Sequence, residues 1–159
     1  MEFKKSVIIV LLICSPLLPI ALEAQTTVSS GVPEAITEEE VRCFIDKYID
    51  RYKAMNLELF MELYSSKSVE NRMLPYADIR KRYQRVFAET NQLVYHVTLY
   101  SVKTYGQRAF VTGQYKTIQT LKEGNEMKTF RGNIQWNLIR EEGALKVSEV
   151  AYGAGHGAY

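Results

Sequence analysis

The spacing of apolar residues changes once along this chain, from a helical period to a strand period. Between residues 37 and 92, apolar side chains recur every three or four positions, which is the spacing of a helix face that packs on a core. From Leu93 onward, β-branched and aromatic residues dominate four runs that are separated by short glycine-bearing breaks. Helices followed by a meander of strands predict an α+β fold, with the helices on one face of the sheet.

Three helices are predicted from their start signals. Thr37 can cap the first helix, and Glu40 can complete a capping box with it. Asn56 can cap a short second helix, and Pro75 suits the first turn of a third. The expected apolar stripes of the second and third helices are Leu59, Phe60, Leu63 and Tyr64, and Ile79, Tyr83, Val86 and Phe87.

Four long strands are predicted at residues 93–105, 108–121, 127–139 and 144–152, with a short strand at 68–71. Each break between the long strands carries a glycine, which is typical of hairpin turns. Because side chains alternate between the two faces of a strand, one face of each strand can be assigned to the core. The residues assigned to this inward face are Ala109, Val111, Gly113, Tyr115, Phe130, Gly132, Ile134, Trp136, Leu138, Leu145, Val147 and Glu149.

The first 24 residues have the pattern of a secretory signal peptide. Lys4 and Lys5 precede an apolar run, and a small residue, Ala24, stands at the cleavage position. We therefore predict an exported protein, either periplasmic or extracellular. The alternative is a retained N-terminal membrane anchor, since an apolar run of about 17 residues is near the lower limit for a membrane-spanning helix. The expected regions are a signal peptide at 1–24, a flexible leader at 25–36, one domain at 37–153 and a loose tail at 154–159.

The charge, cysteine and histidine content of the chain bears on nucleic-acid binding, disulfide formation and metal binding. The net charge of +2 is too small to indicate nucleic-acid binding, so the basic residues from Arg80 to Arg85 are expected to form a solvent-exposed helix face. Only Cys43 remains after cleavage, and it is expected to be buried or to pair with another chain. His96 and His156 show no paired metal-ligand spacing, so neither a metal nor another cofactor is expected.

Three segments carry a resemblance to a known family: FIDKYIDRYKAMNLELFMELYS, DIRKRYQRVF and GNIQWNLIREEGALKVSEVAYG. In their order and spacing, residues 37–153 resemble the nuclear transport factor 2-like superfamily, also called SnoaL-like. The resemblance implies a cone-shaped, curved antiparallel sheet packed on N-terminal helices, a cystatin-like roll with a cavity between the two layers. Family members include isomerases, dehydratases, cyclases, ligand-binding modules and dimerising domains, so the fold alone does not determine the function.

Catalytic members of this family usually place an aspartate, a histidine or a tyrosine inside the cavity. The aspartates of the domain, Asp46, Asp50 and Asp78, all lie on predicted helices, which puts isomerase chemistry in doubt. Gly113 and Gly132 on the inward face either leave space for a pocket or mark bends in the sheet. The residues expected to line a ligand pocket are Tyr48, Tyr52, Tyr83, Tyr115, Trp136 and Glu149.

Three functions are compatible with these residues. The first is an exported binding or accessory domain, dimeric, that takes a small apolar or aromatic ligand and has no membrane partner after signal cleavage. The second is a cavity enzyme in which Glu149 and a tyrosine, Tyr52 or Tyr83, transfer a proton. The third is a structural module that dimerises through the outer sheet face at Arg131, Asn133 and Gln135.

Overall fold

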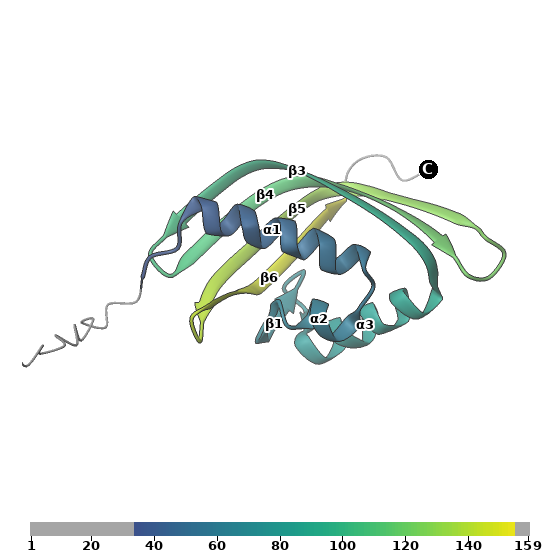
Figure 1. The fold of residues 1–159 in the computed structure, drawn as a ribbon, viewed down its shortest axis with the longest axis horizontal. Helices are drawn as coiled ribbons and strands as arrows, with labels where there is room; N and C mark the ends of the chain where they lie inside the picture. Colours follow the sequence, from purple (N-terminus) through teal and green to yellow (C-terminus); the bar gives the residue numbers. More distant parts are fainter. Residues whose placement is uncertain (1–33, 155–159) are drawn as a thin grey trace, which may run out of the picture. The chain divides into compact units, whose positions relative to one another are not determined.

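The computed structural model describes residues 34–154, which form three helices and six strands (Figure 1). The helices are α1 (Glu38–Lys53), α2 (Leu57–Met61) and α3 (Tyr76–Glu89). The strands are β1 (Tyr64–Glu70), β2 (Leu74–Pro75), β3 (Thr90–Tyr105), β4 (Arg108–Leu121), β5 (Met127–Glu141) and β6 (Ala144–Ala154). The predicted signal peptide, residues 25–33 of the leader, and residues 155–159 of the tail with His156 lie outside the described residues.

The strands form one sheet in the order β2-β1-β6-β5-β4-β3. As predicted, β3 to β6 are an antiparallel meander, but β1 pairs in parallel with β6, so the sheet is mixed. Figure 1 shows α1 crossing the inner face of the curved sheet, with α2 and α3 near the C-terminal end of α1. The α+β fold with helices on one sheet face is confirmed. Among the described helices, none combines the length and apolar character that crossing a bilayer requires.

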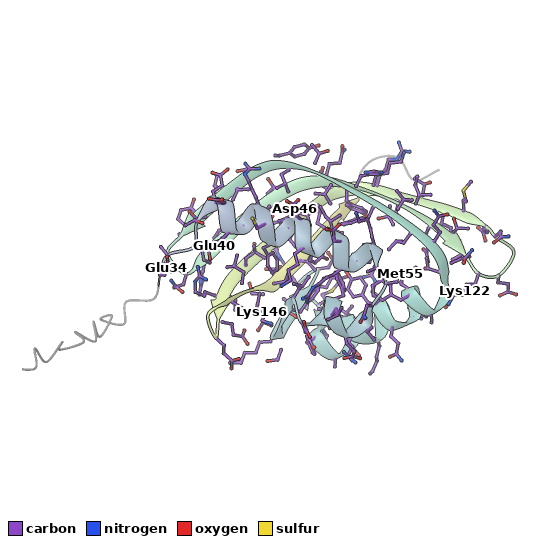
Figure 2. The ribbon with its side chains drawn as sticks, in the orientation of Figure 1. Glu34, Glu40, Asp46, Met55, Lys122 and Lys146 are labelled. Atoms are coloured by element: carbon purple, nitrogen blue, oxygen red, sulfur yellow. The ribbon has the colours of Figure 1, made fainter. Side chains whose placement is uncertain are left out.

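The first helix begins with the capping box that the sequence predicts. The Thr37 hydroxyl accepts a hydrogen bond from the Glu40 N–H at 3.2 Å, and the Glu40 carboxylate accepts one from the Thr37 N–H at 3.0 Å. Glu40 also accepts a hydrogen bond from Arg140 of β5 at 2.9 Å, which ties the start of α1 to the sheet. Figure 2 labels Glu40 in the first turn of this helix and Met55 just after its C-terminal end. Ile36 is also buried, and its N–H donates to the Gly106 carbonyl, so packing begins before Thr37.

The second helix is shorter than predicted. Asn56 caps it as expected by accepting the Leu59 N–H, but the helix ends at Met61 and Tyr64 begins β1. Leu59, which was expected in the apolar stripe, is 43% exposed, and Met61 is buried instead. The predicted strand at 68–71 is the last part of the longer β1.

The core is built largely from aromatic rings on the inner face of the sheet. Trp136 is fully buried and packs edge-on against Tyr48 with 5.7 Å between the ring centroids. Phe60 of α2 contacts Tyr48 in the same manner at 4.9 Å. Aromatic pairs at such spacings contribute about 1 kcal/mol beyond the area they bury. The prediction that Cys43 is buried is wrong, because Cys43 is exposed on α1.

Gly113 allows two strands to approach each other closely. It pairs with Leu99 next to an irregularity in β3, between Leu99 and Ser101. A Cβ atom at Gly113 would lie 2.5 Å from the backbone oxygen of Thr98. Of the two roles considered for this glycine, the structure therefore supports the bend rather than space for a pocket.

A bulge in β6 reverses the faces of its last residues. Leu138 pairs with Val147, but the preceding Asn137 pairs with Glu149, so Ser148 is one extra residue on this strand. One extra residue moves every later side chain to the opposite face of the sheet. The prediction that Glu149 faces inward is therefore wrong, and Tyr152 takes an inward position instead.

Candidate functional site

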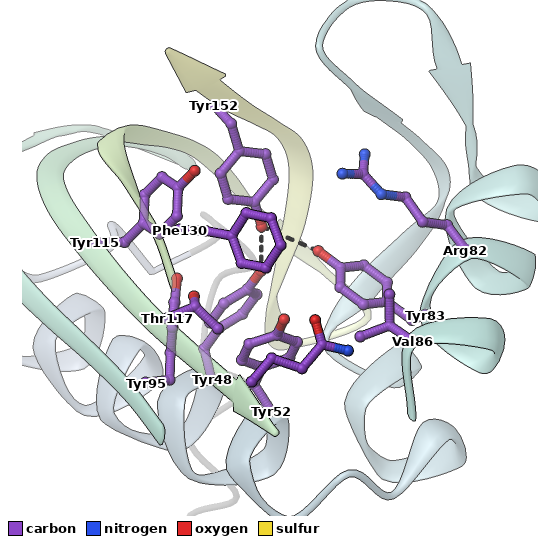
Figure 3. Close-up of a pocket in the computed structure, with 11 residues that line it drawn as sticks. Tyr48, Tyr52, Arg82, Tyr83, Val86, Tyr95, Tyr115, Thr117, Phe130 and Tyr152 are labelled. Carbon is purple, nitrogen blue, oxygen red and sulfur yellow. Dashed lines mark hydrogen bonds between the residues drawn. The ribbon is translucent and has the colours of Figure 1, made fainter. Parts of the chain in front are cut away.

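A partly enclosed cavity of about 180 Å³ lies between the helices and the inner face of the sheet (Figure 3). We call it the tyrosine cavity, because six of its eleven lining residues are tyrosines. The tyrosines come from α1 and α3 on the helix side and from β3, β4 and β6 on the sheet side. The full lining is Tyr48, Tyr52, Arg82, Tyr83, Val86, Tyr95, Tyr115, Thr117, Gln119, Phe130 and Tyr152.

The structure brings together four of the six residues that the sequence assigned to a pocket. These four are Tyr48, Tyr52, Tyr83 and Tyr115. Trp136 does not line the cavity, because it lies in the core with its ring against Tyr48. Glu149 does not line it either, because the β6 bulge turns its carboxylate toward Asn137, whose amide donates to it at 2.8 Å.

Four buried tyrosine hydroxyls form a closed ring of hydrogen bonds at the cavity. We call this set the hydroxyl ring, and it consists of Tyr48, Tyr64, Tyr83 and Tyr152. The short sides join Tyr48 to Tyr64 at 2.8 Å and Tyr83 to Tyr152 at 3.0 Å. The two long sides, Tyr48 to Tyr152 and Tyr64 to Tyr83, each measure 3.4 Å. Figure 3 shows two of these contacts meeting at the Tyr152 hydroxyl.

The hydroxyl ring is neutral at physiological pH. Burial away from water raises the pKa of the Tyr48, Tyr64, Tyr83 and Tyr152 hydroxyls well above the ordinary value. Each hydroxyl can donate one hydrogen bond and accept another, so four of them satisfy one another when they close a ring. The long sides of the ring are its weakest contacts, and one of them joins Tyr48 and Tyr152, which both line the cavity.

Arg82 lines the cavity and forms an ion pair with Glu70, and the sequence pattern predicted neither role. Glu70 lies at the end of β1 with none of its surface exposed, and its Oε1 accepts a hydrogen bond from Arg82 Nη1. Glu70 Oε2 is buried and has no hydrogen-bond partner among the described residues. Burial raises the pKa of the Glu70 carboxyl, and the Arg82 guanidinium acts in the opposite direction. As expected for the basic residues on α3, the Arg82 side chain is exposed to solvent, but it also borders the cavity and pairs with Glu70.

Three further tyrosines that line the cavity have hydroxyls that form no hydrogen bond within residues 34–154. They are Tyr52 of α1, Tyr95 of β3 and Tyr115 of β4. Burial raises the pKa of Tyr52 to about 12, while the positive charge of Arg82 lowers it. Burial also raises the pKa of Tyr115, and Arg82 again acts in the opposite direction. The charge of Arg82 therefore reaches hydroxyls on both the helix side and the sheet side of the cavity.

The cavity lining has many hydroxyl groups but few side chains that can act as an acid or a base near neutral pH. Among the described residues that line the cavity, Arg82 alone carries a formal charge, and there is no histidine, cysteine or carboxylate. Within residues 34–154 there is also no group of three side chains suited to hold a metal ion. The arrangement can enclose a small ring and donate hydrogen bonds to it from several sides.

Sequence comparison finds no family model and no curated protein that matches the chain. Structural comparison finds a nuclear transport factor 2-like superfamily protein from Salmonella enterica with a TM-score of 0.64 and 14% identity, covering 75% of this chain and 92% of that chain. A ketosteroid isomerase-like protein from Erwinia carotovora has a TM-score of 0.59 and 15% identity, covering 73% of this chain and 95% of that chain. A hexachlorocyclohexane dehydrochlorinase has a TM-score of 0.62 and 10% identity, covering 74% of this chain and 84% of that chain.

These similarities are structural, since fewer than one residue in five is identical in each case. Two of these names refer to different activities, a dehydrochlorinase and an isomerase, which agrees with the variety that one fold can support. The order of helices and strands, the curved sheet and the covered inner face all agree with the resemblance seen in the sequence. The described part of this chain has the nuclear transport factor 2-like fold.

Proposed function

We propose that this protein binds a small aromatic or apolar molecule in the tyrosine cavity. The observation that carries the proposal is the cavity itself, which measures about 180 Å³ and has seven aromatic side chains among its eleven lining residues. A cavity of about 150 Å³ lined by apolar side chains is enough to hold benzene. The expected ligand therefore contains one six-membered ring with small substituents.

The lining suits a ring better than a flexible chain. Aromatic side chains contact a planar ring through edge-to-face arrangements, which are already present among the walls. Tyr52 and Tyr95 pack in this way with their centroids 4.8 Å apart, and Tyr115 and Tyr152 do so at 5.4 Å. Ligand sites of this kind are mostly apolar, with a few polar groups that orient the ligand. The hydroxyls and Arg82 provide those polar groups here.

The two other functions have less support from the geometry. Proton transfer by Glu149 requires its carboxylate to reach a ligand, and this carboxylate lies outside the cavity beside Asn137. Dimerisation through Arg131, Asn133 and Gln135 stays a prediction; these three residues are exposed on the outer face of the sheet. Export remains a proposal that rests on the pattern of residues 1–24.

A size series of ligands tests the proposed function. Full-length protein titrated with one-ring, two-ring and three-ring aromatic compounds is expected to bind the one-ring compounds with the highest affinity, measured by calorimetry. Replacing Val86 by phenylalanine places extra volume in the cavity and is expected to lower that affinity at least tenfold.

The matched control places the same substitution at Val94, a partly buried residue that does not line the cavity. Val94→Phe is expected to leave the affinity unchanged. Failure of all one-ring compounds to bind, or equal binding by the Val86→Phe variant, would contradict the proposed function.

A further inference from the structure

We propose that the ligand is a one-ring aromatic carboxylate whose carboxylate group pairs with Arg82 at the rim of the tyrosine cavity. This inference rests on the proposed function, because it assigns a chemical class to the same ligand. It depends on the charge of the lining, on how Arg82 is held, and on the hydroxyls that lie beside it.

The first observation is the charge of the lining. All eleven lining residues belong to the described chain, and Arg82 is the one with a formal charge. Since no carboxylate lines the cavity, nothing there compensates a cationic ligand, whereas an anionic one finds a guanidinium. The charge of the lining therefore favours a negatively charged group over a positively charged one.

The second observation is that Glu70 holds the guanidinium without using all of its donors. Arg82 donates to Glu70 through Nη1, and its Nε and Nη2 groups form no hydrogen bond within residues 34–154. The Arg82 side chain is 48% exposed, while Glu70 lies beneath it with its side chain almost completely buried. Figure 3 shows the guanidinium turned toward Tyr152 at the rim. An arginine that is already held in place loses less side-chain freedom when a carboxylate binds.

Glu70 is thus a positioning residue: it holds the Arg82 guanidinium and does not occupy the place of the ligand carboxylate. Its carboxylate has no exposed surface and does not line the cavity, so it lies on the protein side of the guanidinium. The free donors of Arg82 include the adjacent N–H groups that a carboxylate can accept as a pair. A second carboxylate can therefore approach from the cavity side without displacing Glu70.

The third observation concerns the hydroxyls around this position. Tyr52 and Tyr115 form no hydrogen bond within residues 34–154; burial raises the pKa of both hydroxyls, and the positive charge of Arg82 partly offsets that rise. Each of them can donate a hydrogen bond to a carboxylate oxygen. The aromatic walls then surround the ring of the ligand while Arg82 and these hydroxyls contact its charged end.

The test compares benzoate with benzamide, which has nearly the same shape but no charge. Full-length protein is expected to bind benzoate about tenfold more tightly, and this ratio corresponds to about 1.4 kcal/mol. In the double variant with Glu70→Gln and Arg82→Met, both charges of the pair are removed together. The ratio is then expected to fall to about one, while benzamide keeps its affinity. Circular dichroism of the double variant checks that it is folded.

The matched control is Arg85→Met. It removes one positive charge from the same helix at a residue that does not line the cavity, so the preference for benzoate is expected to persist. If the double variant does not fold, the carboxylate assignment is tested on the wild-type protein instead, by following the Arg82 Nε–H signal with nuclear magnetic resonance. This signal is expected to shift with benzoate and not with benzamide.

The outcomes separate this inference from the proposed function. Benzamide binding as tightly as benzoate, or an Arg82 signal that does not respond to benzoate, would overturn the carboxylate assignment and leave an aromatic-binding protein. If neither compound binds and the neutral one-ring compounds also fail, the proposed function itself is wrong. A ratio that falls equally in the Arg85→Met variant would show a general charge effect and would also overturn the assignment.

Discussion

At pH 8, the Arg82→Met variant is expected to lose about 2 to 3 kcal/mol of its free energy of unfolding. Removing the arginine leaves Glu70 fully buried without its ion-pair partner. Breaking a buried ion pair on one side typically costs about 3 to 5 kcal/mol, and the half-exposed position of Arg82 reduces that value. Urea denaturation at constant ionic strength measures the loss directly.

The loss is expected to shrink at pH 5. Burial raises the pKa of Glu70 in the folded protein above its ordinary value of 4.5, and Arg82 partly offsets this rise. A carboxyl group with a raised folded pKa contributes its full stability below the unfolded pKa and loses it as the pH rises through the folded pKa. Without Arg82 the folded pKa rises further, so Arg82→Met falls in stability between pH 5 and pH 8 more than the wild type does.

The double variant with Glu70→Gln and Arg82→Met provides the control for this effect. It removes the buried charge as well as its partner, so its stability is expected to change less between pH 5 and pH 8 than that of Arg82→Met. An equal loss at both pH values in the single variant would mean that lost packing of the arginine stem, rather than the charge of Glu70, is responsible.

Replacing Gly113 by alanine is expected to destabilise the protein by about 3 kcal/mol. The new Cβ atom would lie 2.5 Å from the Thr98 backbone oxygen, and a backbone atom in a paired strand cannot easily move away. Forcing extra atoms into a packed position costs about 1 to 3 kcal/mol, and a contact with the backbone belongs at the upper end. Thermal and urea denaturation of the variant measure the loss.

Gly153→Ala is the matched control for the Gly113 substitution. A Cβ atom at Gly153 would find its nearest neighbour, the Asn133 Cβ, at 3.7 Å, which is an ordinary contact. The control is expected to change stability by less than about 1 kcal/mol, because neither steric overlap nor a positive φ opposes it. Equal stability of the two variants would show that the strands separate without cost at Gly113.

Local signals in the sequence predicted most of the fold because they depend on neighbouring residues. The capping box of Thr37 and Glu40 needs only four consecutive residues, and it occurs as expected. The three long hairpins follow from glycine-bearing breaks between β-forming runs. The parallel pairing of β1 with β6 was not predicted. It joins segments far apart in the chain, and the residues of one segment do not indicate which strand it pairs with.

The candidate site was predicted only in part, and the β6 bulge explains two of the errors. Strict alternation from Val147 puts Glu149 inside and Tyr152 outside, while the one extra residue at Ser148 reverses both. No residue type at this position marks a bulge, since Ser148 is neither a glycine nor a proline. Tyr152 therefore entered the site only through the structure.

The Glu70–Arg82 pair was missed for a different reason. In the sequence, Glu70 follows a short polar strand and Arg82 lies among other basic residues, so each resembles a solvent-exposed residue. The contact between them forms because α3 packs against β1. A buried carboxylate beside one member of a basic cluster becomes visible only when those two elements are placed in space.

The position of a bound one-ring aromatic ligand tests the account most directly. Intermolecular nuclear Overhauser effects between the ring protons of bound benzoate and the protein would locate the ligand. We expect contacts to the Val86 methyl groups and to the ring of Tyr115, which line the tyrosine cavity from α3 and β4. Contacts to outer-face residues such as Phe110 and Thr112, with none to Val86, would contradict the account.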